Sequence, residues 1–272
     1  MVEISSLDDP RIAEYRFLPQ RTGALRSGER TIVESEVVAR RLLQHEWSSE
    51  IVESALLAPD AAERLGNLLA KRGVPPERVF VAPKALMERI VGYHLHQGVF
   101  LCTRVPPQTE IAALPLPAVV LVGVSSSTNV GAIIRSAAAF GFASIVCDAA
   151  SASPWLRRCI RVSMGAIFAM AWHHAHRTTE ELFAQLRQRG ARLVGAEVGA
   201  PLVYSTFAWT KHDAIVFGSE GHGLSPSLLK QLDAVVRIPI SPAVESLNVA
   251  AAAAIILAEH AEWCGLVHER MP

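Results

Sequence analysis

Two polar stretches in the C-terminal part of the chain combine glycines with an acid, a serine and an asparagine. Residues 218–223 (GSEGHG) place Glu220 among three glycines, which free the backbone for tight turns or for close approach to a ligand. Residues 245–248 (ESLN) place Ser246 and Asn248 directly before an alanine-rich segment of high helix propensity. A helix beginning there offers free N–H groups and the positive end of its dipole to a ligand. Either stretch alone is equally typical of an ordinary turn or cap, but together they favour a binding site.

Each polar stretch follows a short apolar run that predicts a buried strand, at 214–217 and 235–238. Pro239 and Pro242 stop the second strand and define the loop that leads to the alanine-rich helix. Open α/β sheets bind ligands at the carboxyl ends of parallel strands. We therefore expect both loops at one edge of a parallel sheet.

A third segment of interest begins with an unbroken apolar run at 118–124 (AVVLVGV), as expected of a strand covered on both faces. A polar turn follows, and we expect Asn129 to cap a helix that Gly141 closes. Arg135 lies on this helix, where a lone arginine is usually a surface residue.

Three stretches resemble the three motifs of the SpoU/TrmH branch of the SPOUT methyltransferases, in the family's order: 129–141 (NVGAIIRSAAAFG), 217–225 (FGSEGHGLS) and 238–259 (IPISPAVESLNVAAAAAIILAE). The resemblance implies an α/β fold in which a C-terminal SPOUT-type parallel sheet with a trefoil knot follows a small L30e-like α/β domain. It also implies a homodimer that transfers a methyl group from S-adenosylmethionine to a ribose 2′-hydroxyl in RNA. Many family members have an aspartate just before the first-motif asparagine, whereas this chain has Thr128.

The motif positions imply two sets of site residues. The catalytic set is Asn129, Arg135, Glu220, Ser246 and Asn248, and the cofactor-binding set is Gly218, Ile238 and Leu247. Ala196 lies outside the motifs, at the end of a neighbouring predicted strand, and is a further candidate for cofactor binding. Some accounts of the family make the arginine the base. Because a guanidinium does not readily lose its proton, we expect Arg135 to grip the target phosphate instead. We expect Glu220 to fix either Arg135 or Asn129 by a charge-assisted hydrogen bond, and Ser246 to relay a proton or contact the ribose.

The rest of the chain suggests four segments: a basic arm at 1–30, an L30e-like RNA substrate-binding domain at 31–104, a proline-containing linker at 105–117 and the methyltransferase domain at 118–272. The arm is equally consistent with a solvated leader that interleaves arginines and acids. The usual L30e-like pattern has a glycine after its first acidic residue, but here Ser35 follows Glu34. An L30e-like front domain accompanies ribosomal targets more often, so we expect ribosomal RNA in preference to transfer RNA.

The densest basic cluster consists of Arg157, Arg158 and Arg161, which we expect to share a helix face and to clamp RNA phosphates. The alternative is a solvated helix face. Three histidines at 173, 174 and 176 lack further ligands at zinc spacing, so we expect no metal and interpret them as surface or interface residues.

The composition and the motifs argue against several other functional classes for this protein. The 26 lysines and arginines balance 26 aspartates and glutamates, so a whole-chain electrostatic argument for nucleic acid fails. No run approaches the roughly 20 apolar residues of a membrane span, no leader is visible, and the four cysteines are widely spaced, so we expect a cytosolic protein. A Rossmann-like enzyme would need GxGxxG after the first strand, where this chain has SSSTNVG. A non-catalytic RNA-binding or ribosome-assembly protein of the same fold remains an alternative.

Overall fold

The computed structural model describes residues 1–16, 25 and 27–267, and the chain divides into two compact units. Unit 1 contains Met1–Pro107 together with Trp155–Phe168, and unit 2 contains Gln108–Pro154 together with Ala169–Pro272. The division at 107 and 108 falls within the predicted linker. Of the predicted N-terminal arm, Arg21 and Arg26 lie outside the described residues. Within the described residues, no helix is both long and apolar enough to span a membrane.

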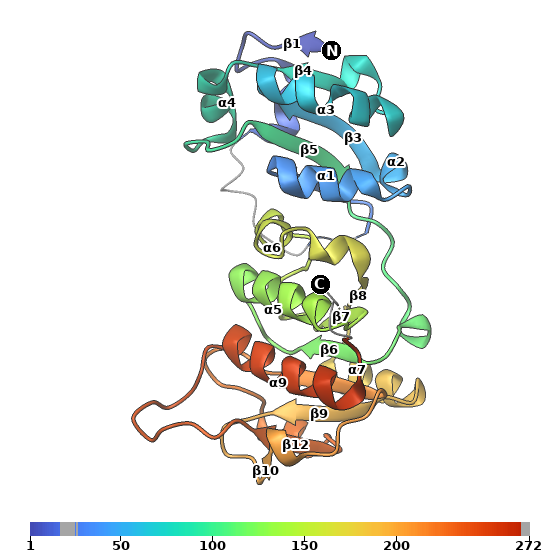
Figure 1. The fold of residues 1–272 in the computed structure, drawn as a ribbon, viewed down its shortest axis with the longest axis vertical. Coiled ribbons are helices and arrows are strands. Elements are labelled where there is room, and N and C mark those ends of the chain that lie inside the picture. Colours follow the sequence, from blue (N-terminus) through green and yellow to red (C-terminus); the bar gives the residue numbers. More distant parts are fainter. Residues whose placement is uncertain (17–24, 26, 268–272) are drawn as a thin grey trace. The chain divides into compact units, whose positions relative to one another are not determined.

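Unit 1 is an α/β unit with a five-stranded sheet in the order β1-β4-β3-β5-β2 (Figure 1). The prediction that residues 31–104 form a small α/β domain is confirmed in its α/β character. The strands are β1 (Val2–Glu3), β2 (Arg30–Glu34), β3 (Val52–Leu57), β4 (Val79–Val81) and β5 (Val99–Arg104). The helices are α1 (Glu36–Gln44), α2 (Ser48–Ile51), α3 (Pro59–Lys71) and α4 (Lys84–Val91).

The first residues of the chain are built into unit 1, which differs from the predicted basic arm. Strand β1 pairs with β4, and a 3-10 helix at Pro10–Tyr15 follows it. Ile12 and Tyr15 are completely buried, and the Tyr15 hydroxyl lies 2.7 Å from Ser54 Oγ. Burial of these apolar side chains holds this part of the segment in the folded unit.

The segment 155–168 also belongs to unit 1, whereas the sequence suggested one continuous domain from residue 118. It contains α6 (Arg157–Val162). Trp155 is almost completely buried, and its carbonyl oxygen accepts a hydrogen bond of 2.7 Å from Thr31 Oγ1. Its ring packs against Phe168 with centroids 5.8 Å apart. Burial of Trp155 and its hydrogen bond from Thr31, which is distant in sequence, therefore hold this segment in unit 1.

Unit 2 contains a seven-stranded sheet in the order β10-β12-β9-β11-β6-β7-β8, and every neighbouring pair is parallel. The predicted parallel α/β sheet is thus confirmed, while the knot stays a prediction. The strands are β6 (Ala118–Leu121), β7 (Ser144–Cys147), β8 (Ala171–His174), β9 (Arg192–Ala196), β10 (Leu202–Val203), β11 (Asp213–Phe217) and β12 (Ala234–Arg237). The helices are α5 (Ser127–Ala139), α7 (Thr179–Gln188), α8 (Pro226–Leu229) and α9 (Val249–Cys264).

The interpretation of the histidines as surface residues is wrong for two of them. His173 and His174 lie in β8 and are buried, whereas His176 is exposed. The ring Nδ1 of His173 lies 3.0 Å from the carbonyl oxygen of Thr109. Because β8 pairs with β7 in the sheet, these two histidines are buried although their side chains are polar.

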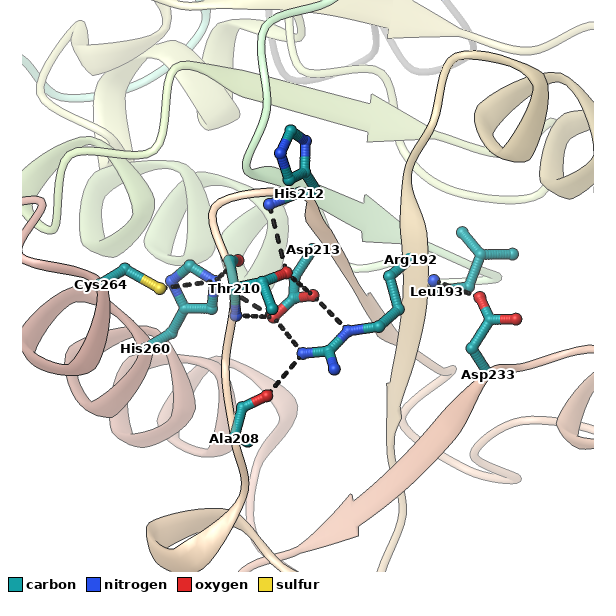
Figure 2. Close-up of polar contacts among 9 residues, drawn as sticks. All are labelled: Arg192, Leu193, Ala208, Thr210, His212, Asp213, Asp233, His260 and Cys264. Atoms are coloured by element: carbon teal, nitrogen blue, oxygen red, sulfur yellow. Dashed lines mark hydrogen bonds and ion pairs between the residues drawn. The ribbon is translucent and has the colours of Figure 1, made fainter.

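A buried polar cluster ties α9 to the sheet at the amino end of β11. Figure 2 shows Asp213 between His260 and Arg192. Arg192 donates from Nε to Asp213 Oδ1 at 2.7 Å, and Thr210 donates its backbone N–H to Oδ2 at 2.8 Å. His260 Nε2 lies 2.9 Å from the Thr210 carbonyl oxygen and 3.5 Å from Asp213 Oδ2. Burial alone would raise the pKa of Asp213, but hydrogen bonds from His260, Arg192 and Thr210 lower it to about 2.

Candidate active site

A pocket of about 330 Å³ lies at the carboxyl ends of β9, β11 and β12 in unit 2. This volume suits a small-molecule site, for which about 300–1,000 Å³ is typical. The pocket is lined by all four predicted cofactor residues, Ala196, Gly218, Ile238 and Leu247, and by two of the predicted catalytic residues, Glu220 and Ser246. Its inner wall includes the buried apolar residues Phe217, Val236 and Ile256. The structure therefore brings together residues that the sequence connected only through motif positions.

A larger hollow of about 640 Å³ lies along α7 in the same unit. None of the predicted site residues lines it. The smaller pocket is the stronger candidate, because it occupies the strand edge where parallel sheets bind ligands and because it contains the motif residues.

The glycine-rich loop after β11 forms one wall of the pocket. Ser219 and Gly223 bridge each other through paired backbone hydrogen bonds of 3.2 and 3.0 Å. A Cβ at Gly218 would collide with the backbone of Gly223, which itself has a φ of +61°. Both glycines are therefore required by the tight fold of this loop, as the sequence predicted.

Asn248 forms the N-cap of α9 and also reaches toward α5. Its Oδ1 accepts from the backbone N–H of Ala250 at 2.9 Å and of Ala251 at 3.4 Å. Its Nδ2 donates to Asn129 Oδ1 at 3.2 Å. Asn248 thus caps α9 through its amide oxygen and contacts Asn129 through its amide nitrogen.

Glu220 connects the loop after β11 to the start of α5. Asn129 Nδ2 donates to Glu220 Oε1 at 2.9 Å, and the backbone N–H of Ser126 donates to the same oxygen at 3.2 Å. Burial raises the pKa of Glu220, but hydrogen bonds from Asn129 and from backbone N–H groups outweigh it and lower the pKa. Glu220 is therefore ionised at neutral pH. Of the two expected partners, Asn129 is confirmed.

The expectation that Asn129 caps its helix is wrong. Helix α5 begins at Ser127, and its N-cap is Ser126, whose Oγ accepts from the Asn129 backbone N–H at 3.4 Å. Serine is as good an N-cap as asparagine, and it takes this role one turn earlier. The side-chain amide of Asn129 is consequently available for Glu220 and Asn248.

Arg135 and Ser246 are both exposed to solvent. Arg135 lies further along α5, and no ion pair or hydrogen bond joins its guanidinium to another residue of the described chain. Ser246 lines the pocket through the loop before α9. Both side chains are accessible to a large substrate, and their roles stay predictions.

The three predicted RNA-binding arginines lie in unit 1, on α6. Arg161 Nη1 donates to Glu34 Oε1 at 3.0 Å, and Arg157 pairs with the other oxygen of Glu34, whose side chain is 9% exposed. Arg157 also lies over the Tyr93 ring, 5.1 Å from its centroid. Arg158 is exposed. An RNA phosphate would compete with Glu34 for two of these residues, and their binding role stays a prediction.

Two contributors were missed by the sequence reasoning, Ser126 and Glu197. Ser126 lay in a run of three serines, any of which could cap the helix. Glu197 directly follows Ala196 at the end of β9, and it is one of the residues that line the pocket. Its position directly after a strand was the sequence signal that could have identified it as a site residue. Among the described residues, no group of three histidine, cysteine or acidic side chains is arranged to hold a metal.

Comparisons with known proteins identify the family. The family model described as the SpoU rRNA Methylase family matches residues 117–258. A Mycobacterium bovis protein named as an uncharacterized tRNA/rRNA methyltransferase is 33% identical over 270 residues, which cover 94% of this chain and 90% of that protein.

Two solved structures share the fold. The AdoMet-bound rRNA methyltransferase from Sinorhizobium meliloti superposes with a TM-score of 0.78 at 22% identity, covering 96% of this chain and 97% of its own. The SpoU methyltransferase AviRb from Streptomyces viridochromogenes has a TM-score of 0.75 at 23% identity, covering 93% and 97%. Together with the family model and the M. bovis relative, the motifs lead to one conclusion. The chain belongs to the SpoU rRNA methylase family, whose members are S-adenosylmethionine-dependent RNA methyltransferases.

Proposed function

We propose that this protein methylates the 2′-oxygen of a ribose in RNA, with ribosomal RNA as the substrate. The observation that carries the proposal is the hydrogen-bonded chain from Glu220 through Asn129 to Asn248. It joins the loop after β11, the first turn of α5 and the N-cap of α9 beside a pocket that suits a small cofactor. A ribose hydroxyl is a weak acid, so its methylation depends on positioning and on an acceptor for its proton.

The pocket fits S-adenosylmethionine in shape and charge. Its wall combines apolar side chains with the backbone of the glycine loop, and its bordering ionisable residues are Glu197, Glu220, Glu245 and His222. No lysine or arginine borders it within the described chain. A lining of this charge favours a cationic ligand. When bound, S-adenosylmethionine supplies a sulfonium-activated methyl group. We assign Gly218, Ile238, Leu247 and Ala196 to holding it.

The polar residues beside the pocket are assigned to orienting the RNA substrate and to handling the ribose proton. Asn129 is held from two sides, by Glu220 and Asn248, so its amide has a fixed orientation toward an incoming substrate. The exposed guanidinium of Arg135 is suited to grip the phosphate next to the target ribose, because arginine binds phosphate through paired N–H groups. Ser246 is placed to hydrogen-bond the ribose or to pass on its proton.

The preference for ribosomal RNA rests on two supports. The matching family model is described as an rRNA methylase family, and the relative from M. bovis is named for both tRNA and rRNA. Most of unit 1 also precedes the methyltransferase motifs in the sequence, and we interpret this α/β unit as an L30e-like substrate-binding domain. In that unit, α6 carries the three arginines that we assign to RNA contact.

We further propose that the protein acts as a cytosolic homodimer. Helix α9 carries two large apolar side chains in contact with solvent, Ile255 at 37% and Trp263 at 53% exposure. Pairing with a second copy would remove this apolar surface from water. Sedimentation of the wild type and of an Ile255→Asp variant tests this point, with a monomeric variant as the expected result.

The reaction itself is tested by supplying S-adenosylmethionine with a labelled methyl group to the purified protein and to ribosomal or transfer RNA from a strain lacking the corresponding gene. Nucleoside analysis is expected to find the label on a ribose from ribosomal RNA. Label on a base would contradict ribose methylation, and label in transfer RNA alone would replace the proposed substrate. No transfer to either RNA, despite cofactor binding, would favour a non-catalytic RNA-binding protein.

A further inference from the structure

Glu197 lies in the wall of the candidate cofactor pocket. It follows β9 directly, and its backbone N–H bonds the carbonyl oxygen of Val236 in β12 at 3.0 Å. The residue is partly buried. None of the family motifs that the sequence displays includes this residue, so its presence in the wall calls for a physical explanation.

The carboxylate is held at both oxygens. Oε1 accepts from the backbone N–H of Val198 at 3.1 Å, and Oε2 accepts from the backbone N–H of Leu224 at 3.1 Å. A Cβ at Gly223 would push the Glu197 carboxylate aside, and the φ of +61° at this position independently favours glycine. Glu197 therefore has a fixed orientation between the loops that follow β9 and β11.

The two N–H donors leave part of the carboxylate's capacity unused. An ionised carboxylate offers about four lone-pair sites, and the backbone fills two of them. No salt bridge involves Glu197 in the described part of the chain. A partly buried anion without a cationic partner gains free energy from any further hydrogen-bond donor that enters the pocket.

The donors that S-adenosylmethionine offers are an α-ammonium group, an adenine amine and two neighbouring ribose hydroxyls. The ammonium carries a carboxylate beside it, which Glu197 would repel and which no arginine or lysine of the pocket wall would neutralise. The adenine amine and the hydroxyls are neutral donors without this penalty. An acidic residue after a strand recognises a cofactor ribose in the same way in dinucleotide-binding folds.

We propose that Glu197 binds the cofactor's ribose hydroxyls and so selects a ribonucleoside-based methyl donor. This inference rests on the proposed cofactor role of the pocket. It gives Glu197 two functions, since the same carboxylate that receives the ligand also fixes the glycine loop around it.

The test is a calorimetric comparison of S-adenosylhomocysteine with its 2′-deoxy and 3′-deoxy analogues, on wild-type protein and on Glu197→Ala. In the wild type, we expect loss of at least one hydroxyl to weaken binding about tenfold, as for a hydrogen bond to a charged group. Glu197→Ala is expected to weaken S-adenosylhomocysteine binding about tenfold and to abolish the difference between it and that analogue. Glu180→Ala is the matched control, because Glu180 is an exposed glutamate in the first turn of α7 and does not line the pocket. It should keep the wild-type difference.

Each other outcome has a distinct meaning. If removal of a ribose hydroxyl weakens binding by the same factor in Glu197→Ala as in the wild type, Glu197 only holds the two loops together. The inference is then wrong. If the wild type binds both deoxy analogues as tightly as the parent, the inference is wrong whether or not the variant folds. If the wild type binds no S-adenosylhomocysteine, the cofactor role of the pocket fails first, and the inference fails with it.

Discussion

The side-chain amide of Asn129 donates to the carboxylate of Glu220 over 2.9 Å, although 91 positions separate the two residues in the chain. Asn248 donates to the other end of the same amide. Three motifs that are far apart in sequence are thus joined through one asparagine side chain. This arrangement makes the orientation of Asn129 dependent on both partners.

Replacing Glu220 with alanine should therefore impair methyl transfer through misplacement of Asn129. We expect kcat to fall about a hundredfold, the effect typical of losing catalytic alignment. The measurement is methyl transfer at saturating RNA and cofactor. Glu180→Ala removes an exposed glutamate from the first turn of α7 and serves as the control. If Glu220→Ala turned over as fast as this control, the hydrogen-bonded chain would have no catalytic role.

Much of this site was predictable from the sequence because strand ends and loops follow local rules. The apolar run before Gly218 ends in a loop at the predicted edge, and the position of Ile238 in the same pocket follows from the parallel sheet. The cap of α5 was not predictable, because Ser126 and Asn129 are equally good N-caps.

Contacts between residues that are distant in sequence explain the remaining differences between the predictions and the structure. The pairing of Arg157 with Glu34 joins residues from distant segments, and no spacing rule indicates it. His173 was interpreted as a surface or interface residue because no further zinc ligands accompany it, but its place in β8 buries it. Tyr15 anchors a segment whose arginines suggested a free arm. In each case, burial against a distant segment outweighs a local signal.

Ser35 has a φ of +86°, a backbone conformation that favours glycine, and it stands where the L30e-like pattern has glycine. It also caps α1 through a long hydrogen bond of 3.4 Å to the Val38 N–H. We expect Ser35→Gly to stabilise the protein by about 1 kcal/mol, because relief of strain exceeds the loss of a weak cap. Chemical denaturation measures the change.

The matched control for this substitution is Ser225→Gly. Ser225 caps α8 at an ordinary φ of −62° and accepts from the Leu228 N–H at 3.3 Å. Without strain to relieve, this substitution should lower the free energy of unfolding by roughly 0.5 kcal/mol. Equal destabilisation by both substitutions would show that the backbone of Ser35 is not strained.

The buried cluster around Asp213 makes stability depend on pH in the acid range. The pKa of this carboxyl falls from 3.8 to about 2 on folding, so the folded state favours its ionised form. The stabilisation is complete above pH 4 and is lost as the pH falls toward 2. From the pKa shift, it amounts to on the order of 2 kcal/mol.

Asp213→Asn should therefore be less stable than the wild type at pH 7, by about 3 kcal/mol, since it also leaves Arg192 without its buried partner. Below pH 4 the difference between the two proteins should shrink. Urea denaturation across this pH range measures it. A difference that stayed constant down to pH 2 would mean that the charge of Asp213 does not stabilise the fold.

The separation of cofactor binding from RNA handling is the central claim, and calorimetric titration of S-adenosylmethionine into wild-type and Arg135→Ala protein tests it most directly. Arg135 is exposed on α5 and is absent from the pocket wall, so both proteins should bind with Kd values within about threefold of each other. Methyl transfer should be lost only in the variant. Failure of the folded wild type to bind S-adenosylmethionine would contradict the assignment of the pocket, and loss of binding in the variant alone would place Arg135 in the cofactor site.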